Sequence, residues 1–234
     1  MGRPKLPFKK FNWTPRLAYA VGLLVTDGCL SKDGRHIVMH SAEPQLLKAF
    51  HQCIKTRANI TKQKGKHTSY KIQVGDIQLY NWLMSIGLSP AKTYSIGSID
   101  ISDKFFRDFL RGHLDGDGSI QAYTDKYNIY RGRVYTANRL FVRLISVSEN
   151  HIMWLHSKIV DLVNIKGALI KRADKTGYRV PMFEIKFAKK ESIKLLEWIY
   201  YNKRLPCLLR KRRLAELNIH KIKIEKRKTY AKIT

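Results

Sequence analysis

The sequence predicts an α+β fold made of two pseudo-symmetric αββαββα repeats, each with an antiparallel sheet. One stretch, an apolar helical pattern with glycine at its third position and a closing Asp-Gly, occurs at 20–28 and again at 110–118. A helix, two strands, a helix, two strands and a helix are predicted in that order around each copy. The aspartates that close the two copies lie 90 residues apart, which is the spacing of a repeated structural unit.

The two motif helices have similar predicted ends. Each is expected to begin at capping residues and to end at a glycine in the left-handed conformation: Thr14 and Pro15, then Gly28, in the first copy, and Ser102 and Asp103, then Gly118, in the second.

Small residues four apart lie on one face of each motif helix, with Gly22 in the first copy and Gly112 in the second. Such faces let two helix backbones approach closely. A glycine inside a helix costs about 1 kcal/mol, so two glycines at matching positions need a structural reason of this kind. We therefore expect the motif helices to pack together at the interface of the repeats. Asp27 and Asp117 would then emerge side by side, and a shared divalent cation would relieve their repulsion.

The remaining elements follow from capping, turn and alternation signals. The first repeat is expected to contain a helix at 15–27, strands at 29–31 and 35–40, a helix at 44–56, strands at 60–64 and 69–74, and a helix at 76–86. The second is expected to contain strands at 119–124 and 139–147, a helix at 150–163, strands at 168–172 and 179–187, and helices at 191–201 and 208–217. We predict a long polar loop at 125–137, which has no counterpart in the first repeat. The expected division is a basic arm at 1–13, repeats at 14–98 and 99–217, and a basic, disordered tail at 218–234.

The chain has 45 Lys and Arg against 18 Asp and Glu, a formal net charge of +27 spread along its 234 residues. This excess indicates a polyanionic partner, most simply nucleic acid. A ribosomal type of protein would share the charge but not the helical periodicity of so many apolar residues. The three cysteines form no CxxC pair, which favours an intracellular, reducing compartment such as the cytoplasm or an organelle matrix. The longest apolar run is too short to cross a bilayer, so no membrane partner is expected.

The paired motifs resemble those of the LAGLIDADG homing endonucleases in their single-chain form, over roughly residues 13–217. The motif departs from the family pattern at Val25 and Thr26 in the first copy and at Arg111 and His113 in the second. The resemblance implies that the two sheets form a saddle on double-stranded DNA, and that a monomer cuts both strands. It also implies catalytic roles for residues at family positions: Lys92 and Lys211 in charge stabilisation or water activation, and His40 and Ser146 in water positioning.

Oxygen ligands without a Cys/His cluster favour Mg²⁺ over zinc. We expect Asp27 and Asp117 to share two or three Mg²⁺ ions, helped by the carbonyls of Thr26 and Gly116, with Mn²⁺ as a substitute. Two other interpretations fit less well. An EF-hand loop beginning at Asp115 would require Gly and Glu where Ile120 and Lys126 stand, and an aspartic protease would carry its acids on loops of β-rich lobes.

The outward faces of the strands supply candidate DNA contacts. The candidates are Arg35, His36, Lys62, Lys64, Lys71 and Gln73 in the first repeat, and Arg131, Arg133, Arg139, Arg143, Lys171, Arg172, Glu184 and Lys186 in the second. A slip of one residue would move any strand's set to the other face. Since the two sets differ, we predict an asymmetric target.

The sequence thus predicts a site-specific, Mg²⁺-dependent DNA endonuclease, encoded in an intron or free-standing. An RNA-binding maturase that acts on intron RNA and a DNA-binding regulator that does not cleave are the alternatives.

Overall fold

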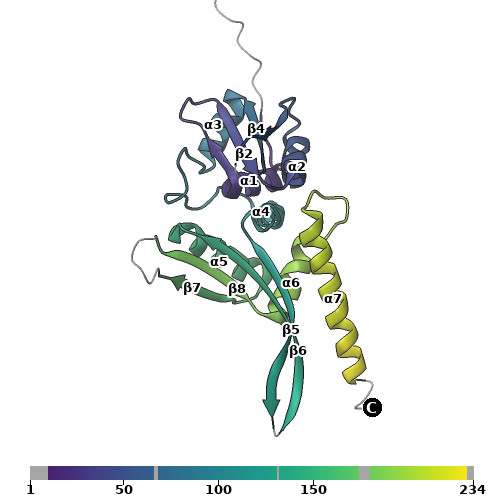
Figure 1. Cartoon of the computed structure of the whole chain (residues 1–234). Helices are drawn as coiled ribbons and strands as arrows, with labels where there is room; N and C mark the ends of the chain where they lie inside the picture. The colour runs from purple at the N-terminus through teal and green to yellow at the C-terminus, as the bar shows by residue number, and fades with distance from the viewer. Residues whose placement is uncertain (1–9, 66–67, 131, 174–179, 231–234) are drawn as a thin grey trace, which may run out of the picture.

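The computed structural model describes residues 10–65, 68–130, 132–173 and 180–230, and Figure 1 shows its elements in order. The side chains of 127–128, 130, 133–135 and 225–230 are outside this description. The first repeat consists of α1 (Pro15–Asp27), β1 (Gly28–Leu30), β2 (His36–Ser41), α2 (Pro44–Ile54), β3 (Ile60–Gln63), β4 (Ser69–Gly75) and α3 (Ile77–Ser85). The second consists of α4 (Asp103–Gly116), β5 (Ser119–Tyr130), β6 (Arg133–Ser146), α5 (Glu149–Val163), β7 (Ala168–Arg172), β8 (Met182–Phe187) and α6 (Lys189–Ile199), and α7 (Leu209–Tyr230) follows.

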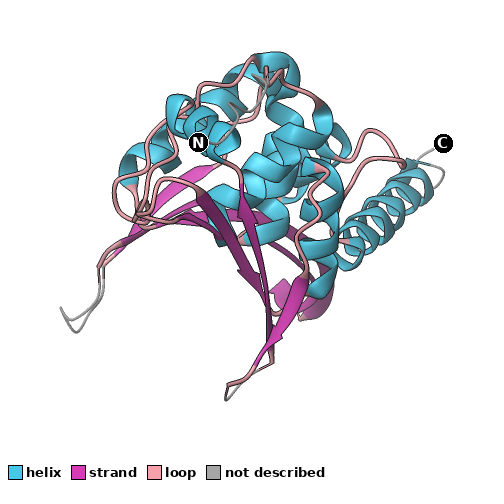
Figure 2. Ribbon diagram, turned by 90° about the horizontal axis from the view of Figure 1, so that it is seen from above, coloured by secondary structure: helices cyan, strands magenta, loops and turns pink. Residues whose placement is uncertain are grey.

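Each repeat forms one antiparallel sheet with the same topology. The strand orders are β1-β2-β4-β3 and β5-β6-β8-β7, so each strand occupies the same place in its sheet as its counterpart. The predicted pair of αββαββα repeats is therefore confirmed. α1 and α4 pack against each other between the two halves (Figure 1). The helices lie on one side of the arched sheets, and the other side is open (Figure 2).

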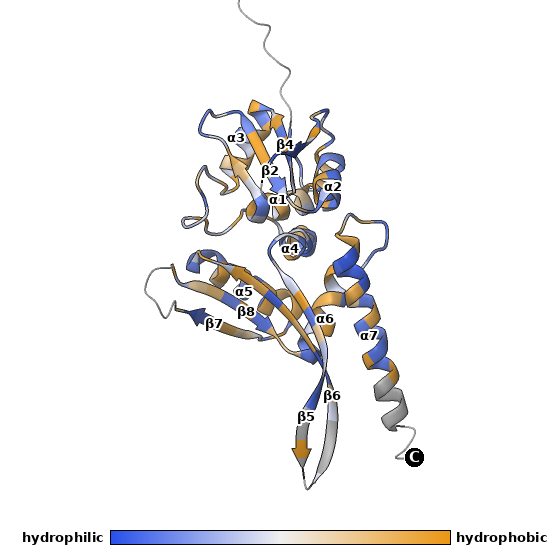
Figure 3. Ribbon diagram, viewed as in Figure 1, coloured by the Kyte–Doolittle hydropathy of each residue, from blue (hydrophilic) through white to orange (hydrophobic). Residues whose placement is uncertain are grey.

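The sheets are one-sided because the strand sequences alternate. β4 and β8 carry hydrophobic and hydrophilic residues in turn (Figure 3). Their apolar members, such as Ile72 and Ile185, are fully buried against the helices. Such alternation is what an antiparallel sheet with one solvated face requires. Among the described residues, no helix is long and apolar enough to span a bilayer.

The helix ends differ in part from the predictions. The Thr14 hydroxyl accepts a hydrogen bond from Leu17 N at 3.1 Å, as a capping residue should, whereas Ser102 makes no side-chain cap. Gly28 is extended, with φ −101°, so the predicted left-handed end of α1 is wrong, and Gly118 also has no positive φ. Glycine is required at Gly28 and Gly118 for space instead. A Cβ atom would lie 2.6 Å from Leu24 Cα in the first motif and 2.8 Å from Leu114 Cα in the second.

The predicted loop at 125–137 is wrong, since this segment extends β5 and β6 into one long hairpin that protrudes from the sheet (Figure 1). The pairing register shifts between Asp125 and Asn128 and then resumes. Arg139 Nη2 donates to Asp125 Oδ2 across the two strands at 3.0 Å. The Tyr, Thr, Ile and Val residues of this segment favour strands, and that preference prevails over its polar composition.

The described residues next to the two ends of the chain pack against the repeats. Phe11 stacks on Trp82 of α3 with ring centroids 5.5 Å apart, so the described end of the basic arm is anchored. α7 continues through residues 218–230, where a disordered tail was expected. Ala215 and Ile222 of α7 are buried, since the helix packs against α6 and β5.

Candidate nucleic-acid interface and metal centre

The closest backbone contact between the repeats lies at Gly22 of α1 and Gly112 of α4. A Cβ atom at Gly22 would lie 2.1 Å from Phe109 O, and one at Gly112 would lie 2.2 Å from Tyr19 O. Each glycine thus meets the backbone of the opposite helix, which cannot move aside as a side chain can. This contact explains why both motifs contain a helical glycine despite its cost.

The helix contact brings the ends of the two motifs together. A Cβ atom at Gly116 would lie 2.0 Å from Thr26 Oγ1 and 3.1 Å from Asp27 Oδ2, so the end of α4 directly adjoins the carboxylate of α1. Burial, followed by the nearby charge of Asp117, raises the pKa of Asp27 to about 6. The pKa of Asp117 is also raised, because protein atoms around the helix ends displace part of its hydration. The site therefore holds two close carboxylates whose ionised forms are disfavoured.

Lys92 and Lys211 bind the carbonyl ends of the motif helices. Lys92 Nζ donates to Gly28 O at 2.6 Å, and Lys211 Nζ donates to Gly118 O, the corresponding atom of the second repeat, also at 2.6 Å. Lys211 Nζ also lies within 3.1 Å of the carbonyl oxygens of residues 114, 115 and 116. Cations are favourable at helix C-termini, and here they fix the chain that carries each aspartate. Burial lowers the pKa of both lysines.

The carbonyls of Thr26 and Gly116 were predicted as metal ligands. The carbonyl oxygen of Gly116 accepts a hydrogen bond from Lys211 Nζ at 3.1 Å. Asp27 and Asp117 fit a divalent cation, because an added positive charge would offset the burial of both carboxylates and the effect of Asp117 on the pKa of Asp27. Within the described part of the chain, no three His, Cys, Asp or Glu side chains converge on one point. The remaining oxygen ligands of such a cation would be backbone carbonyls or groups of a bound partner.

His40 and Ser146 do not occupy equivalent places. Ser146 Oγ accepts from Ser148 N at 3.0 Å, and Ser41 Oγ makes the same bond with Glu43 N at 3.1 Å. Ser146 therefore corresponds to Ser41, and the counterpart of His40 is Ile145. The expected equivalence of His40 and Ser146 is therefore wrong by one residue, as can happen when strands are aligned by sequence alone. Their role in water positioning stays a prediction.

A cavity of about 310 Å³ adjoins Asp117 and is lined by residues of both repeats. Its polar lining is Thr26, Lys92, Thr93, His113, Asp117, Ser146 and His151. His113 and His151 are buried with their rings 5.3 Å apart, and burial lowers the pKa of both, that of His151 to about 4. These neutral imidazoles were not predicted as part of the site, although His113 is one of the departures from the motif.

A buried network of hydrogen bonds holds α4 in the core. Asp115 is 1% exposed and accepts from Tyr19 Oη at 3.0 Å, Tyr200 Oη at 3.2 Å and Leu208 N at 2.6 Å. Arg111, also 1% exposed, donates to Asp108, to the carbonyl of Ile199 at the end of α6, and to that of Pro206 between α6 and α7. Asp115 is adjacent in sequence to the motif's closing residues but is directed into the core. It ties α4 to the segment that carries Lys211.

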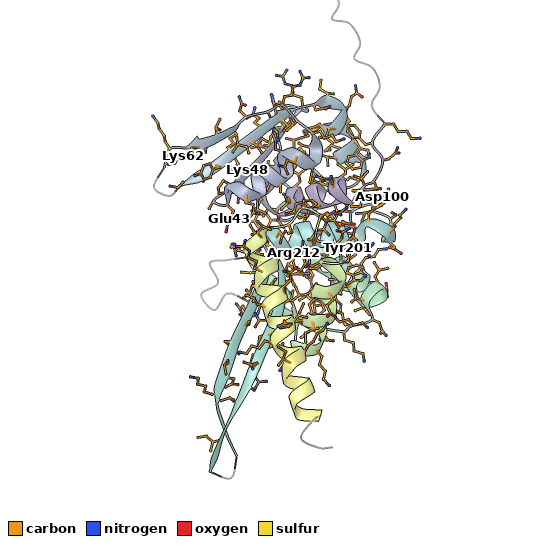
Figure 4. The ribbon with its side chains drawn as sticks, turned by 90° about the vertical axis from the view of Figure 1, so that its right-hand side faces the viewer. Glu43, Lys48, Lys62, Asp100, Tyr201 and Arg212 are labelled. Atoms are coloured by element: carbon orange, nitrogen blue, oxygen red, sulfur yellow. The ribbon has the colours of Figure 1, made fainter. Side chains whose placement is uncertain are left out.

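The open face of the first sheet is defined by its register. His36, His40, Lys71 and Gln73 share that face, because Ile37, Met39, Ile72 and Val74 occupy the buried one. Arg35 and Lys64 lie exposed just outside the strands. Lys62, labelled in Figure 4, was predicted on the open face, but it pairs with Tyr70 and shares that residue's face. Thr61 and Gln63 occupy the open face instead.

The open face of the second sheet carries Arg139, Arg143, Arg172 and Lys186. Lys171 was predicted on this face, but it pairs with Phe183 on the other face, with its Nζ 5.3 Å from that ring's centroid. Glu184 has the expected orientation, but it is 2% exposed, so the expectation of a solvent-facing carboxylate is wrong. Arg133 lies in β6 with its side chain outside the description, and Arg131 is outside the described residues.

No known family profile matches the chain, and no curated protein matches it in sequence. Several solved structures are similar to it in fold. The I-LtrWI LAGLIDADG homing endonuclease bound to target DNA is similar with a TM-score of 0.58 and 14% identity, over 94% of this chain and 93% of that one. I-DmoI in complex with DNA and Ca is similar with a TM-score of 0.56 and 14% identity, over 86% of this chain and 97% of that one. Full-length DUF199/WhiA from Thermatoga maritima is similar with a TM-score of 0.55 and 16% identity over 92% of this chain. The match spans 62% of the WhiA chain.

The chain therefore has the two-repeat LAGLIDADG fold that its motifs predicted. At these identities the similarity establishes the fold alone. Both nucleases and WhiA share it, so the chemistry has to be argued from the residues of this chain.

Proposed function

We propose that this chain is a monomeric, site-specific DNA endonuclease that hydrolyses one phosphodiester in each strand with divalent metal ions. The observation that carries the proposal is the pair Asp27 and Asp117, two carboxylates with raised pKa values at adjoining helix ends. A protein that only binds DNA gains nothing from two acids directed at phosphate. The +27 charge and the two open, basic sheet faces supply the attraction for DNA.

Asp27 and Asp117 would hold Mg²⁺ or Mn²⁺, with help from backbone carbonyls near the same helix ends. When bound, the metal would activate a water and neutralise charge on the phosphate. Lys92 and Lys211 keep the two acids in place through their bonds to Gly28 and Gly118. Their ammonium groups also add positive charge beside the reacting phosphate.

The two sheets would lie along the duplex and read it asymmetrically, because their open faces carry different residues. The net charge and the free cysteines fit a reducing, intracellular setting, which is part of the proposal.

A DNA-binding regulator without cleavage is the second candidate. The observation that favours it is the shared fold with DUF199/WhiA, whose name is not that of a nuclease. The two candidates differ in what happens to DNA in the presence of Mg²⁺.

The test is selection from a pool of random duplexes, for cleaved molecules in Mg²⁺ or Mn²⁺ and for bound molecules in Ca²⁺. We expect a unique cleaved sequence for the wild-type chain and none for Asp27→Asn. The matched control is Asp100→Asn, the same change at an exposed aspartate, which should cut as the wild type does. Specific binding without cleavage in either metal would overturn the nuclease and favour the regulator.

A further inference from the structure

Two arginines and a buried glutamate form a cluster on the open face of the second sheet. Glu184 of β8 lies diagonally between Arg143 of β6 and Arg172 of β7. Arg172 Nε and Nη2 are both 2.6 Å from Glu184 Oε2, and Nε donates a hydrogen bond to it. Arg143 Nε is 3.3 Å from Oε1, an ion-pair contact in which these two buried atoms form no hydrogen bond. Diagonal neighbours on one face are within reach of long side chains, so the strand register dictates this cluster.

The exposures in the cluster show which groups a partner meets. The side chain of Glu184 is 3% exposed, against 25% for Arg143 and 52% for Arg172. A bare carboxylate on this face would repel DNA phosphates. Because the glutamate is buried and paired with the two guanidinium groups, the surface instead presents cations.

The two arginines have different groups left for a partner. Arg172 uses Nε and Nη2 on the glutamate and lies on the edge strand β7. Arg143 approaches the glutamate through Nε and lies on the inner strand β6, and its guanidinium carries two further nitrogens, Nη1 and Nη2. Two parallel N–H donors are the fork that matches O6 and N7 of guanine in the major groove.

The first sheet lacks this arrangement at the corresponding place. The register puts Lys71 where Glu184 stands and His40 where Ile145 stands. Lysine is a flexible point charge, whereas a restrained guanidinium loses less entropy on binding. The two halves of the protein therefore differ in how rigidly their basic residues are held.

We propose that Glu184 is a positioning residue that holds Arg143 as the reader of one guanine in the half of the target bound by the second sheet. Arg172 contributes a contact to the DNA backbone. This inference rests on the proposed DNA-binding function and adds to it a base and a residue that determine specificity.

The test is the base preference at each target position, measured by selection of bound duplexes from a random pool in Ca²⁺. The wild type should prefer guanine about tenfold or more at one position of one half-site. Arg143→Lys, which keeps the charge and removes the fork, should abolish that preference alone. Glu184→Gln should reduce it several-fold and leave affinity for unrelated DNA equal or higher, since it removes a negative charge.

Lys71→Gln is the matched control, and it should alter positions only in the other half-site. Glu184→Asp, which keeps the charge on a shorter side chain, should give an intermediate profile, and thermal unfolding of each variant checks that it is folded. An unchanged guanine preference in Glu184→Gln, or an equal loss of base preference in both half-sites, would overturn the inference. A wild-type chain that selects no sequence would instead overturn the proposed function.

Discussion

The raised pKa of Asp27 predicts that the metal-free protein gains stability when this carboxylate is removed. Asp27 has an ordinary value of 3.8 and a folded value of about 6, because of burial and the charge of Asp117. Folding therefore disfavours the ionised form. The associated stability is fully present below pH 4, is lost as the pH rises through 6, and is absent above it.

The pKa shift sets the size of the effect of Asp27→Asn. At 1.36 kcal/mol per unit, the cost of ionised Asp27 above pH 7 is at most about 3 kcal/mol. Lys92 and Lys211 attract the ionised form, and the side chain keeps some hydration, so we expect a gain of about 2 kcal/mol. For a chain of this size that corresponds to roughly 4–8 °C in Tm.

The assay is thermal unfolding in EDTA from pH 4 to pH 8. At pH 7.5 the Tm of Asp27→Asn should exceed that of the wild type by this amount, and the two Tm values should converge at pH 4. Exposed Asp100→Asn carries the same change of charge and should follow the wild type throughout. A difference independent of pH, or a less stable Asp27→Asn at pH 7.5, would refute the account of the acid pair.

Two further predictions concern the helix pair and its lysines. Gly22→Ala should destabilise the protein by about 3 kcal/mol or more in denaturant unfolding, because its Cβ would lie 2.1 Å from a backbone oxygen, whereas Gly97→Ala has open space and should be nearly neutral. Equal effects of the two changes would contradict the close helix contact. Lys211→Met should lower stability by about 2 kcal/mol and reduce cleavage, because it leaves several buried carbonyls unpaired, and exposed Lys221→Met is its control. Cleavage unaffected by Lys211→Met would remove this lysine from the site.

Much of the fold could be predicted because its signals are local or repeated. The duplicated motif, the alternating strands and the capping Thr14 lie within short stretches of sequence. The contact between the two motif helices could also be predicted from Gly22 and Gly112, since a glycine inside a helix needs a structural reason.

The errors arose where a long-range contact decides the structure. The hairpin extending β5 and β6 depends on pairing between two polar segments, and α7 depends on packing of Ala215 and Ile222 against another helix and a strand. The faces of Lys62 and Lys171 required the exact strand register, which composition does not fix.

The candidate site was predictable only in its repeated part. Asp27 and Asp117 follow from the motif, and Lys92 and Lys211 from family positions. The burial of Glu184 under two arginines, and of His113 beside His151, depends on neighbours distant in sequence. Such residues could be recognised only after the sheets and helices had been placed.

The proposed function requires that Asp27 and Asp117 together cut a duplex held by the open faces of the two sheets. Its most direct test is cleavage of the selected target in Mg²⁺ by the double variant Asp27→Asn, Asp117→Asn, with binding recorded on the same DNA. The account predicts that cleavage disappears in both strands while binding remains equal or becomes tighter. Persistent cleavage by the double variant would contradict it.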